Sequence, residues 1–484
     1  MVSSSLLPLA LLVSLSANVL AAPHPSPPSS LSMDLKRRSS PRARSQDDIA
    51  AWAAAHRSNV QAKYGNTSSK QKRSSGQNLI VNQKSDSSFF GSIAVGTPPV
   101  AYDVILDTGS SDLWLAGKTC LSDACSGIAT FNPSSSSSFQ NKSEPFQITY
   151  GSGEASGTLG QDLVQMAGFS VSNQVFAVCD VVSDNLLNNP VSGLLGLAFQ
   201  TIASSGASPL WETLASSNSW DQPLMAFQLT RFNNDSNAGD LQAGGTFTMG
   251  ATNSSLFTGD IDYNDIPAGE ESYWLQTISS ITSQGSAISI ASGSSALAAI
   301  DTGTTLIGGP EEEVAAIYAN IPNSKAGTGQ LEGYYQYPCS TTVNVTMAFG
   351  GKSWAISNAD FQAEQLSKDT CLGAFFSLST GSNAPAWIVG DTFLKNVYSV
   401  FRYNPASVGF AELSAAALAQ NGNTDLAIPS ATIGSAAATV SATGGATRES
   451  HNSAPSTAAS SLSSLALSAL VIASTMLVST LQSI

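Results

Sequence analysis

Short runs of apolar β-formers alternate with polar turn residues through most of this chain. From about Asn78 to Ala416, runs of Val, Ile, Phe and Tyr are separated by Gly, Ser, Asn and Pro, and few stretches show helical spacing. This texture predicts an all-β body. Before the body, residues 49–63 carry a helical pattern. After it, the chain becomes rich in Ala, Ser, Thr and Gly, which predicts a disordered stalk.

The predicted body repeats one pattern in each half. VILDTGSSDLWL places Asp107 directly after an apolar strand, and AAIDTGTTLIGG places Asp301 in the same setting. Each half later contains two apolar residues followed by a glycine, at Gly196 and at Gly390. Two similar halves that each supply one carboxylate predict a two-lobed protein with its site between the lobes.

An aspartate pair has a definite chemistry. Two carboxyl groups within hydrogen-bonding distance share one proton over an acidic range, because ionising both places like charges side by side. The charged member can take a proton from water, and the protonated member can donate to a carbonyl oxygen. Thr can brace the opposite half, and Gly lets a backbone amide approach the carboxylate. The pattern therefore predicts addition of water to an amide without a covalent intermediate.

The remaining residues exclude several other mechanisms. The chain has three histidines, His24, His56 and His451, and all of them lie outside the predicted body. Ser-His-Asp catalysis, Cys-His catalysis and histidine-based metal sites are excluded, and we expect neither metal nor cofactor. Glycoside hydrolases also use two carboxyl groups, but they do not require a twofold repeat around them. GGKS at 350–353 lacks the upstream glycine of a phosphate-binding loop and predicts a turn.

These motifs resemble those of the pepsin-like (A1-type) aspartic endopeptidases over about Asn78 to Ala416. The resemblance implies an all-β, bilobal pepsin-like fold, with the cleft between two related β-lobes and with Asp107 and Asp301 as the catalytic pair. ITYGSGEASG resembles the flap that closes over the substrate, and Trp114 matches the partner of the flap tyrosine, Tyr150. GLLGLAF and WIVGDTFL resemble segments that pack beside the aspartates. The other implied residues are, around the pair, Thr108, Gly109, Ser110, Thr302, Gly303 and Thr304, and, in the flap and substrate pocket, Gly151, Ser152 and Ile105.

The same resemblance implies an aspartic endopeptidase that cuts peptides at acidic pH, prefers large apolar residues beside the cut and binds pepstatin-type inhibitors. Ile105, Tyr150 and Leu186 would line the apolar pocket. One alternative is yapsin-like cleavage after basic residues: Glu154 lies near the flap, although Ser152 stands where some relatives have an aspartate. A second is a catalytically silent binding or inhibitor member of the fold. A structural wall protein would leave the aspartate pair unexplained.

Charge is distributed unevenly along the chain. The net charge is −14, yet half of the 20 basic residues lie between Lys36 and Arg73. From Ser74 onward, 10 basic and 31 acidic residues give −21, which disfavours nucleic acid and suits low pH. We interpret the basic segment as a propeptide that loosens when carboxylates protonate. By the resemblance, Lys63 and Tyr64 block the aspartate pair in a zymogen, and processing follows the dibasic pair Lys72 and Arg73.

Both chain ends carry targeting patterns. The N-terminal apolar stretch and the small residues up to Ala21 indicate a secretory signal peptide, although no Lys or Arg precedes them. At the other end, an uncharged stretch from Leu465 to Leu481 follows a Ser/Thr/Ala spacer. This predicts a GPI-attachment signal of the fungal type, with Asn452 as the modified residue. A tail-anchored transmembrane helix is the alternative. We expect a monomer, anchored at the plasma membrane or wall or released from it.

Because a secreted protein meets an oxidising environment, four of the five cysteines can be interpreted as two disulfides. We expect Cys120–Cys125 and Cys339–Cys371, with Cys179 as a buried free thiol. Glycosylation sequons occur at Asn66, Asn141, Asn234, Asn253 and Asn344. The predicted division of the chain is signal peptide 1–21, basic propeptide 22–73, N-terminal catalytic lobe 74–230, C-terminal catalytic lobe 231–416, stalk 417–452 and attachment signal 453–484.

Overall fold

The structure is a computed structural model that describes residues 75–184, 186–381, 384–430 and 438–441. All of the described residues belong to one compact unit. Among them, no helix is long and apolar enough to cross a membrane. The predicted signal peptide, propeptide and attachment signal lie outside the described residues, as do Lys63, Tyr64, Asn66, Lys72, Arg73 and Asn452.

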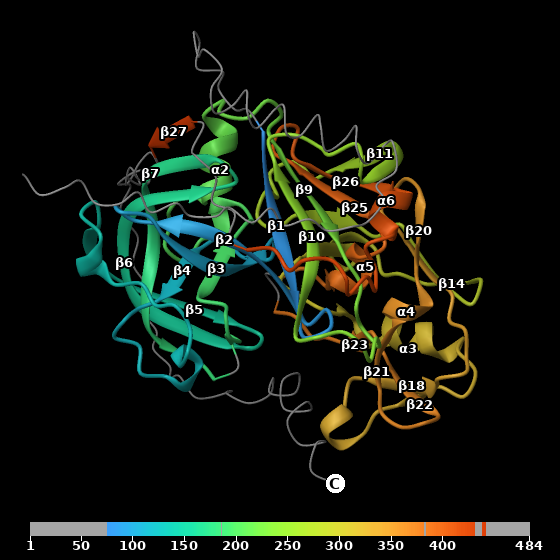
Figure 1. Cartoon of the computed structure of the whole chain (residues 1–484). Coiled ribbons are helices and arrows are strands. Elements are labelled where there is room, and N and C mark those ends of the chain that lie inside the picture. The colour runs from blue at the N-terminus through green and yellow to red at the C-terminus, as the bar shows by residue number, and fades with distance from the viewer. Residues whose placement is uncertain (1–74, 185, 382–383, 431–437, 442–484) are drawn as a thin grey trace, which may run out of the picture. The chain divides into compact units, whose positions relative to one another are not determined.

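Strands dominate the described residues, as the alternating pattern predicts (Figure 1). One large sheet contains 14 strands. They are β1 (Gly76–Gln83), β2 (Ser88–Val95), β3 (Val100–Asp107), β4 (Leu113–Ala116), β5 (Gln140–Tyr150), β6 (Gly153–Met166), β7 (Phe169–Val182), β8 (Gly193–Gly196), β9 (Leu224–Leu229), β10 (Leu241–Met249), β11 (Phe257–Asp265), β25 (Tyr398–Arg402), β26 (Ser407–Leu413) and β27 (Ala438–Ser441).

Three smaller sheets and five short helices complete the described fold. The five-stranded sheet contains β12 (Leu275–Thr277), β15 (Leu297–Ile300), β16 (Ile307–Gly309), β23 (Phe375–Ser377) and β24 (Trp387–Val389). The two four-stranded sheets contain β13 (Ser280–Ser283), β14 (Ser286–Ile288), β19 (Val345–Ala348) and β20 (Ser353–Ile356), and β17 (Lys325–Ala326), β18 (Tyr335–Pro338), β21 (Gln362–Gln365) and β22 (Thr370–Gly373). The helices are α2 (Leu210–Ser216), α3 (Glu311–Ala319), α4 (Asn358–Phe361), α5 (Asp391–Leu394) and α6 (Ala415–Leu418).

The two halves repeat one order of strand pairing around their Asp-Thr-Gly turns. In the first half, β3 runs parallel to β8, β8 antiparallel to β4, and β4 parallel to β7. In the second, β15 runs parallel to β24, β24 antiparallel to β16, and β16 parallel to β23. The repeat seen in the sequence is therefore a repeat of topology, and it places each aspartate at the end of an equivalent strand.

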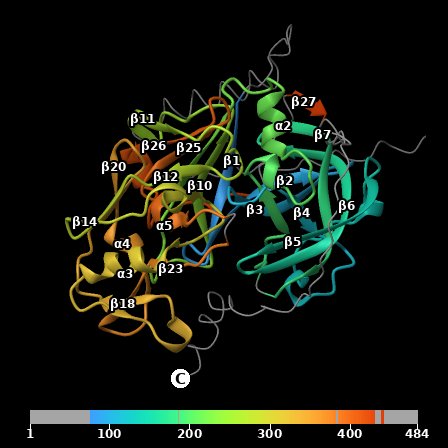
Figure 2. The ribbon, with the colours of Figure 1, turned by 180° about the vertical axis from the view of Figure 1, so that it is seen from behind.

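Strands from both halves join in the large sheet. β1 pairs with β2 and β10, β9 pairs with β10 and β25, and β25 pairs with β26. β3 shows why these segments form strands: Tyr102, Val104 and Leu106 alternate onto the buried face, whereas Asp103 and Ile105 lie on the less buried face. Figure 2, seen from behind, shows β1 and β10 between the two groups of strands.

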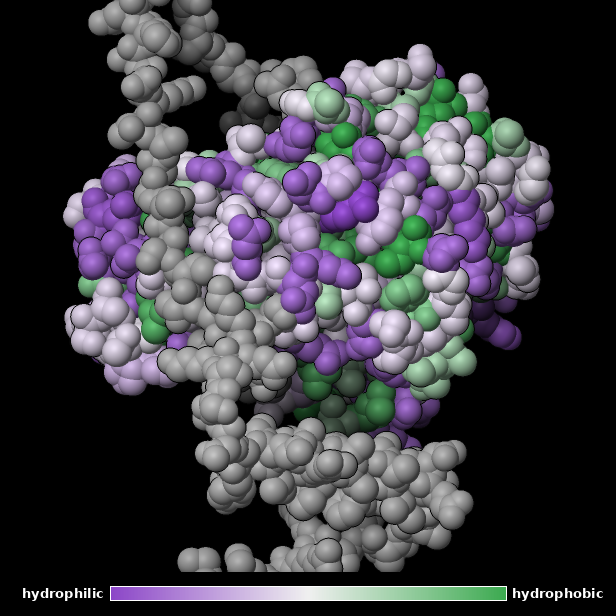
Figure 3. Space-filling model, turned by 90° about the horizontal axis from the view of Figure 1, so that it is seen from above, coloured by the Kyte–Doolittle hydropathy of each residue, from purple (hydrophilic) through white to green (hydrophobic). Residues whose placement is uncertain are grey.

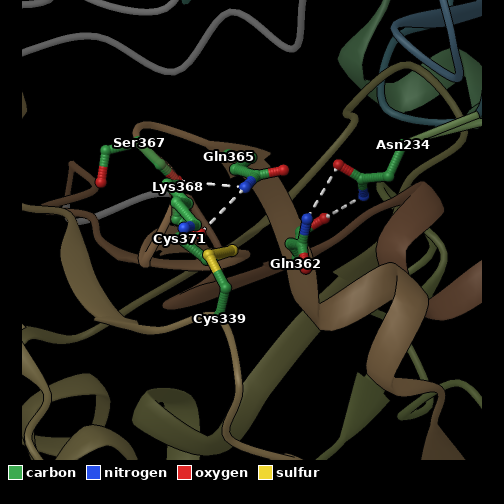
Figure 4. The surroundings of a disulfide bond; sticks show 7 residues. All are labelled: Asn234, Cys339, Gln362, Gln365, Ser367, Lys368 and Cys371. Carbon is green, nitrogen blue, oxygen red and sulfur yellow. Dashed lines mark hydrogen bonds between the residues drawn. A yellow bond between two sulfur atoms is a disulfide. The ribbon is translucent and has the colours of Figure 1, made fainter. Parts of the chain in front are cut away.

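Both predicted disulfides are present. Cys120 and Cys125 close a five-residue loop, and Cys339 joins the end of β18 to Cys371 in β22, with their Cα atoms 5.0 Å apart. Figure 4 shows this second bridge. Cys179 is buried and free, as predicted, and burial raises the pKa of its thiol, so the cysteine packs as an apolar residue.

Four of the predicted sequon asparagines lie in the described residues. Asn141, Asn234 and Asn344 are exposed, and Asn253 is half-buried. The amide of Asn234 donates to the carbonyl of Gln362 at 3.0 Å and accepts from its side chain at 3.0 Å (Figure 4). Glycosylation at these positions stays a prediction.

Candidate active site

The two Asp-Thr-Gly turns brace each other across the halves. The hydroxyl of Thr108 donates to the carbonyl of Ile300 at 2.8 Å, and the hydroxyl of Thr302 donates to the carbonyl of Leu106 at 2.6 Å. Each threonine oxygen also accepts the backbone N–H of the other threonine, at 2.9 and 3.1 Å. These four bonds leave the buried threonines little freedom to move. The geometry of one turn is thereby fixed by the other.

Each aspartate carboxylate is held by the same two donors. Asp107 accepts from the N–H of Gly109 at 2.8 Å and from the hydroxyl of Ser110 at 2.5 Å. Asp301 accepts from the corresponding groups, the N–H of Gly303 at 2.8 Å and the hydroxyl of Thr304 at 2.6 Å. Both carboxylates are therefore oriented by short, nearly equivalent bonds.

The glycines of the turns show that the carboxyl groups lie face to face. A Cβ atom added at Gly109 would lie 2.6 Å from the carboxyl of Asp301, and one added at Gly303 would lie 2.3 Å from Oδ1 of Asp107. Each glycine thus lies against the aspartate of the opposite half. Any side chain at either position would push the two halves apart at the reacting centre.

Gly196 and Gly390 fill matching places behind the turns. A Cβ atom at Gly196 would lie 2.3 Å from the backbone of Ser111, and one at Gly390 would lie 2.0 Å from the carbonyl of Thr304. In both halves the strand that crosses behind the aspartate packs backbone against backbone. This explains why each half carries a glycine after two apolar residues.

The pair has the electrostatics of a shared proton. Burial raises the pKa of Asp107 well above its usual range, and the neighbouring charge of Asp301 raises it further. The bonds from Ser110 and Gly109 oppose this shift without cancelling it. One carboxyl group of the pair therefore keeps its proton under conditions in which an exposed aspartate loses it.

The flap lies over this centre. β5 and β6 form its hairpin, with Tyr150 paired to Gly153 across the tip that Gly151 and Ser152 make. The indole N–H of Trp114 donates to the hydroxyl of Tyr150 at 2.8 Å. Burial and the nearby Asp107 raise the pKa of Tyr150 well above its usual value, so the phenol stays protonated. The sequence-predicted flap residues and the aspartate pair therefore belong to one site.

An apolar cluster adjoins the flap. Ile105 and Tyr150 are half-buried and pack against a buried group that includes Leu186 and Leu194. The N–H of Glu154 donates to the hydroxyl of Ser183 at 2.9 Å, which ties the flap near its tip to the loop that carries Leu186. The residues expected in the apolar pocket are thus brought together.

Two further residues of the site were not singled out in the sequence. Burial raises the pKa of Tyr273, and Asp301 and Asp107 raise it further, which places this phenol within the field of both aspartates. Asp391, in α5, is 1% exposed, and its Oδ1 has no hydrogen-bond partner among the described residues. It follows Gly390 in the segment WIVGDTFL. The sequence of that motif does not show whether the aspartate is buried or caps a helix, so the sequence alone could not identify it.

Asp391 gives the fold a pH dependence. Burial raises its pKa well above the usual value, Lys395 opposes the shift, and Asp301 adds to it. The unfolded chain ionises this group near pH 3.9, whereas the folded chain keeps it protonated, so its contribution to stability falls as the pH rises from about 4. Asp391→Asn is therefore expected to raise the melting temperature at pH 7 by a few degrees and to change it little at pH 4.

Asp360→Asn is the matched control for that measurement. Burial raises the pKa of Asp360, but Lys395 and Arg231 outweigh burial and hold the pKa below its usual value. Its stabilisation is present at neutral pH and is lost as the pH falls, so Asp360→Asn should lower the melting temperature most at pH 7. If the two variants shift the melting temperature in the same direction at pH 7, Asp391 is not a buried carboxyl that lowers the stability of the fold at neutral pH.

The described residues contain no group of three or more His, Cys, Asp or Glu side chains placed to hold a metal ion. What the geometry provides instead is a pair of facing carboxyl groups, one at the end of each of two equivalent strands, beneath a hairpin that carries a half-buried phenol. A water molecule between such carboxyl groups can be deprotonated by one of them while the other donates a proton. This fold and this site define the class of aspartic-type peptidases.

Comparison with known proteins agrees with that class. The family model described as eukaryotic aspartyl protease matches residues 88–413. Major aspartyl peptidase 1 of Cryptococcus neoformans var. grubii is 48% identical over 362 residues, which are 73% of this chain and 74% of that protein. Pepsin A of Suncus murinus and pepsin A of Sus scrofa are each 34% identical over 334 residues, 68% of this chain and 82% of theirs. The chain belongs to the eukaryotic aspartyl protease family, and it is a pepsin-like aspartic endopeptidase.

Proposed function

We propose that this endopeptidase is secreted, anchored at the cell surface, active at acidic pH and selective for large apolar residues beside the cut. The observation that carries the catalytic part is the face-to-face arrangement of Asp107 and Asp301, each held by one backbone N–H and one hydroxyl. The targeting part is supported by the patterns at the two chain ends.

In the proposed mechanism the two carboxyl groups share one proton and hold the attacking water between them. The charged carboxylate takes a proton from the water as its oxygen attacks the peptide carbonyl carbon. The protonated carboxyl donates to the carbonyl oxygen, which gives a neutral tetrahedral diol. Proton transfer to the leaving nitrogen then breaks the C–N bond. The hydroxyls of Ser110 and Thr304 keep both carboxyl groups aligned throughout.

The proposed mechanism works only while the aspartate pair carries one proton, and this requirement supports activity at acidic pH. The pair must carry one proton, and the raised pKa of Asp107 retains that proton above the range of an exposed aspartate. As the pH rises through that pKa, the pair becomes doubly charged and the acid needed at the carbonyl oxygen is lost. Activity should therefore decline on the alkaline side with loss of this single proton.

Apolar selectivity is supported by the packing beside the flap, where Ile105, Tyr150 and Leu186 meet. Cleavage after basic residues is the second candidate, and Glu154 is the observation that favours it, because it lies exposed in the flap strand β6. Its carboxylate accepts from the side chain of Gln147 at 3.1 Å, which directs it along the hairpin. We therefore place apolar residues first.

Digestion of a peptide library at pH 3 to 5, with and without a pepstatin-type inhibitor, tests this function. We expect cleavage between large apolar residues and its abolition by the inhibitor. Cleavage that follows Lys or Arg instead, and that Glu154→Gln weakens, would establish the basic alternative. A correctly folded, processed protein that binds the inhibitor but cuts no peptide would be a silent member of the fold.

A further inference from the structure

The chain does not end with the family span. That span stops at Leu413, the last residue of β26. Beyond it, the structure describes α6 and then a four-residue strand, β27. β27 does not pair with the neighbouring β26 or β25. It pairs in parallel with the first residues of β7, so that Ala438 lies opposite Phe169 and Ser441 opposite Ser172.

The start of β7 offers an edge for such a strand. Along one side, β7 is paired with β6, including Met166 opposite Phe169. Along the other side, β4 pairs only with Ala177–Cys179, farther along the strand. In its parallel pairing, β27 supplies backbone partners to Phe169–Ser172, as a strand added to a sheet edge does. β27 is therefore held by backbone pairing, which depends little on which side chains the stalk carries.

This docking position lies far from the flap. β6 begins at the flap with Gly153 and ends at Met166, beside the residues that bind β27. A strand of 14 residues spans about 40 Å when straight. β27 also contacts α2, and both views place β27, β7 and the labelled end of α2 at the opposite end of the described body from β18 (Figures 1 and 2). Figure 3, which looks onto the molecule from above, shows polar and apolar residues interspersed on that face.

We infer that Ala438–Ser441 is a mooring strand, which fixes the point where the C-terminal stalk leaves the enzyme. Because β27 is bound at the far end of β6, an anchor beyond it would hold the enzyme by that end and leave the flap facing away from the attachment surface. About 11 residues separate Ser441 from Asn452, a reach of about 40 Å at full extension. The orientation rests on the anchoring proposed above, whereas the pairing does not.

The pairing is tested by hydrogen–deuterium exchange on the full chain with Val440→Pro. Proline removes the backbone N–H of residue 440 and is disfavoured within paired strands for that reason. We expect peptides that cover Phe169–Ser172 to exchange at least about tenfold faster in this variant, with the flap unchanged. Thr447→Pro, in the same stalk but outside β27, should leave exchange as in the parent. Equal protection in Val440→Pro and the parent would overturn the mooring strand.

Activity provides a control for that experiment. β27 pairs with the start of β7, at the other end of that strand from the flap, so kcat/KM for a short soluble peptide should agree within about twofold among the parent and both proline variants. A large loss in Val440→Pro, together with faster exchange throughout the protein, would mean that the strand supports the whole fold and not the stalk alone. That result would also overturn the inference.

The orientation is tested on cells with cysteines introduced at two exposed positions. Ser216→Cys lies at the end of α2, a helix that contacts β27, and Gln330→Cys lies in the loop before β18. With a bulky polyethylene glycol maleimide, Ser216→Cys should react several-fold more slowly than Gln330→Cys on the anchored enzyme. Release by a phosphatidylinositol-specific phospholipase, or addition of Val440→Pro, should remove the difference. Equal rates on the anchored enzyme would overturn the orientation.

An enzyme found only in the medium would refute the anchoring, and the hydrogen–deuterium exchange result would still decide whether the mooring strand exists.

Discussion

Asp107→Asn is expected to lower kcat/KM for a peptide substrate by about 10³-fold or more, with no loss of the fold. Asparagine has nearly the same shape, so the bonds from Gly109 and Ser110 can largely be kept, but it can neither take a proton from water nor share one with Asp301. Asp301→Asn should have a similar effect. Because the two groups act as a unit, the double variant should be little worse than either single variant.

The measurement is peptide hydrolysis across pH 3 to 7, with the melting temperature recorded for each variant. Asp123→Asn, which changes an exposed carboxyl in the disulfide loop, is the matched control and should retain parental activity. A variant at Asp107 that folds normally and keeps even a tenth of the parental kcat/KM would rule out the aspartate pair as the reacting centre.

Lys395→Met is expected to destabilise the fold by about 3–5 kcal/mol at pH 7, because it removes the cation from a buried ionic cluster. The ammonium of Lys395 lies 2.6 Å from Oδ2 of Asp86 and 3.1 Å from Oδ1 of Asp360, and its side chain is 3% exposed. Arg231 pairs with the other side of Asp360. Without Lys395, one buried carboxylate is left without a cation.

The loss should be smaller at pH 3, because a buried carboxylate that has lost its cation can be protonated there and then carries no unpaired charge. Chemical denaturation at both pH values measures the effect. Lys352→Met is the control: its ion pair with Glu412 is half-exposed, and its loss should cost less than about 1 kcal/mol. If Lys395→Met and Lys352→Met are equally mild at pH 7, the cluster does not hold the halves together as the structure indicates.

This cluster explains how the body is tied together away from the aspartates. Asp86 lies in the turn between β1 and β2, and its carboxylate also accepts from the backbone N–H groups of Phe232 and Asn233, at 2.7 and 3.1 Å. Those residues follow β9, where the chain passes from the first half to the second. One buried carboxylate thus joins the N-terminal hairpin, the connection between the halves, and Lys395 beyond α5.

The sequence by itself determined the all-β character of the body, the strand that precedes each aspartate, the turn glycines, the flap hairpin and the cysteine pairs. These are local: alternation over a few residues sets a strand, and Asp-Thr-Gly at its end sets a turn, wherever the strand later pairs. Cys120 and Cys125 are close along the chain, and Cys179 lies in an apolar run that favours a buried free thiol, which left Cys339 and Cys371 to pair.

Only the tertiary structure decided which distant groups meet. Asp86 and Lys395 are separated by 309 positions, and no periodicity links them. Asp391 became a buried acid because α5 packs behind the second aspartate, and β27 became part of the body because its backbone pairs with the start of β7. The physical reason is that ion pairing, burial and edge pairing depend on separation in space, whereas the patterns read from a sequence report only separation along the chain.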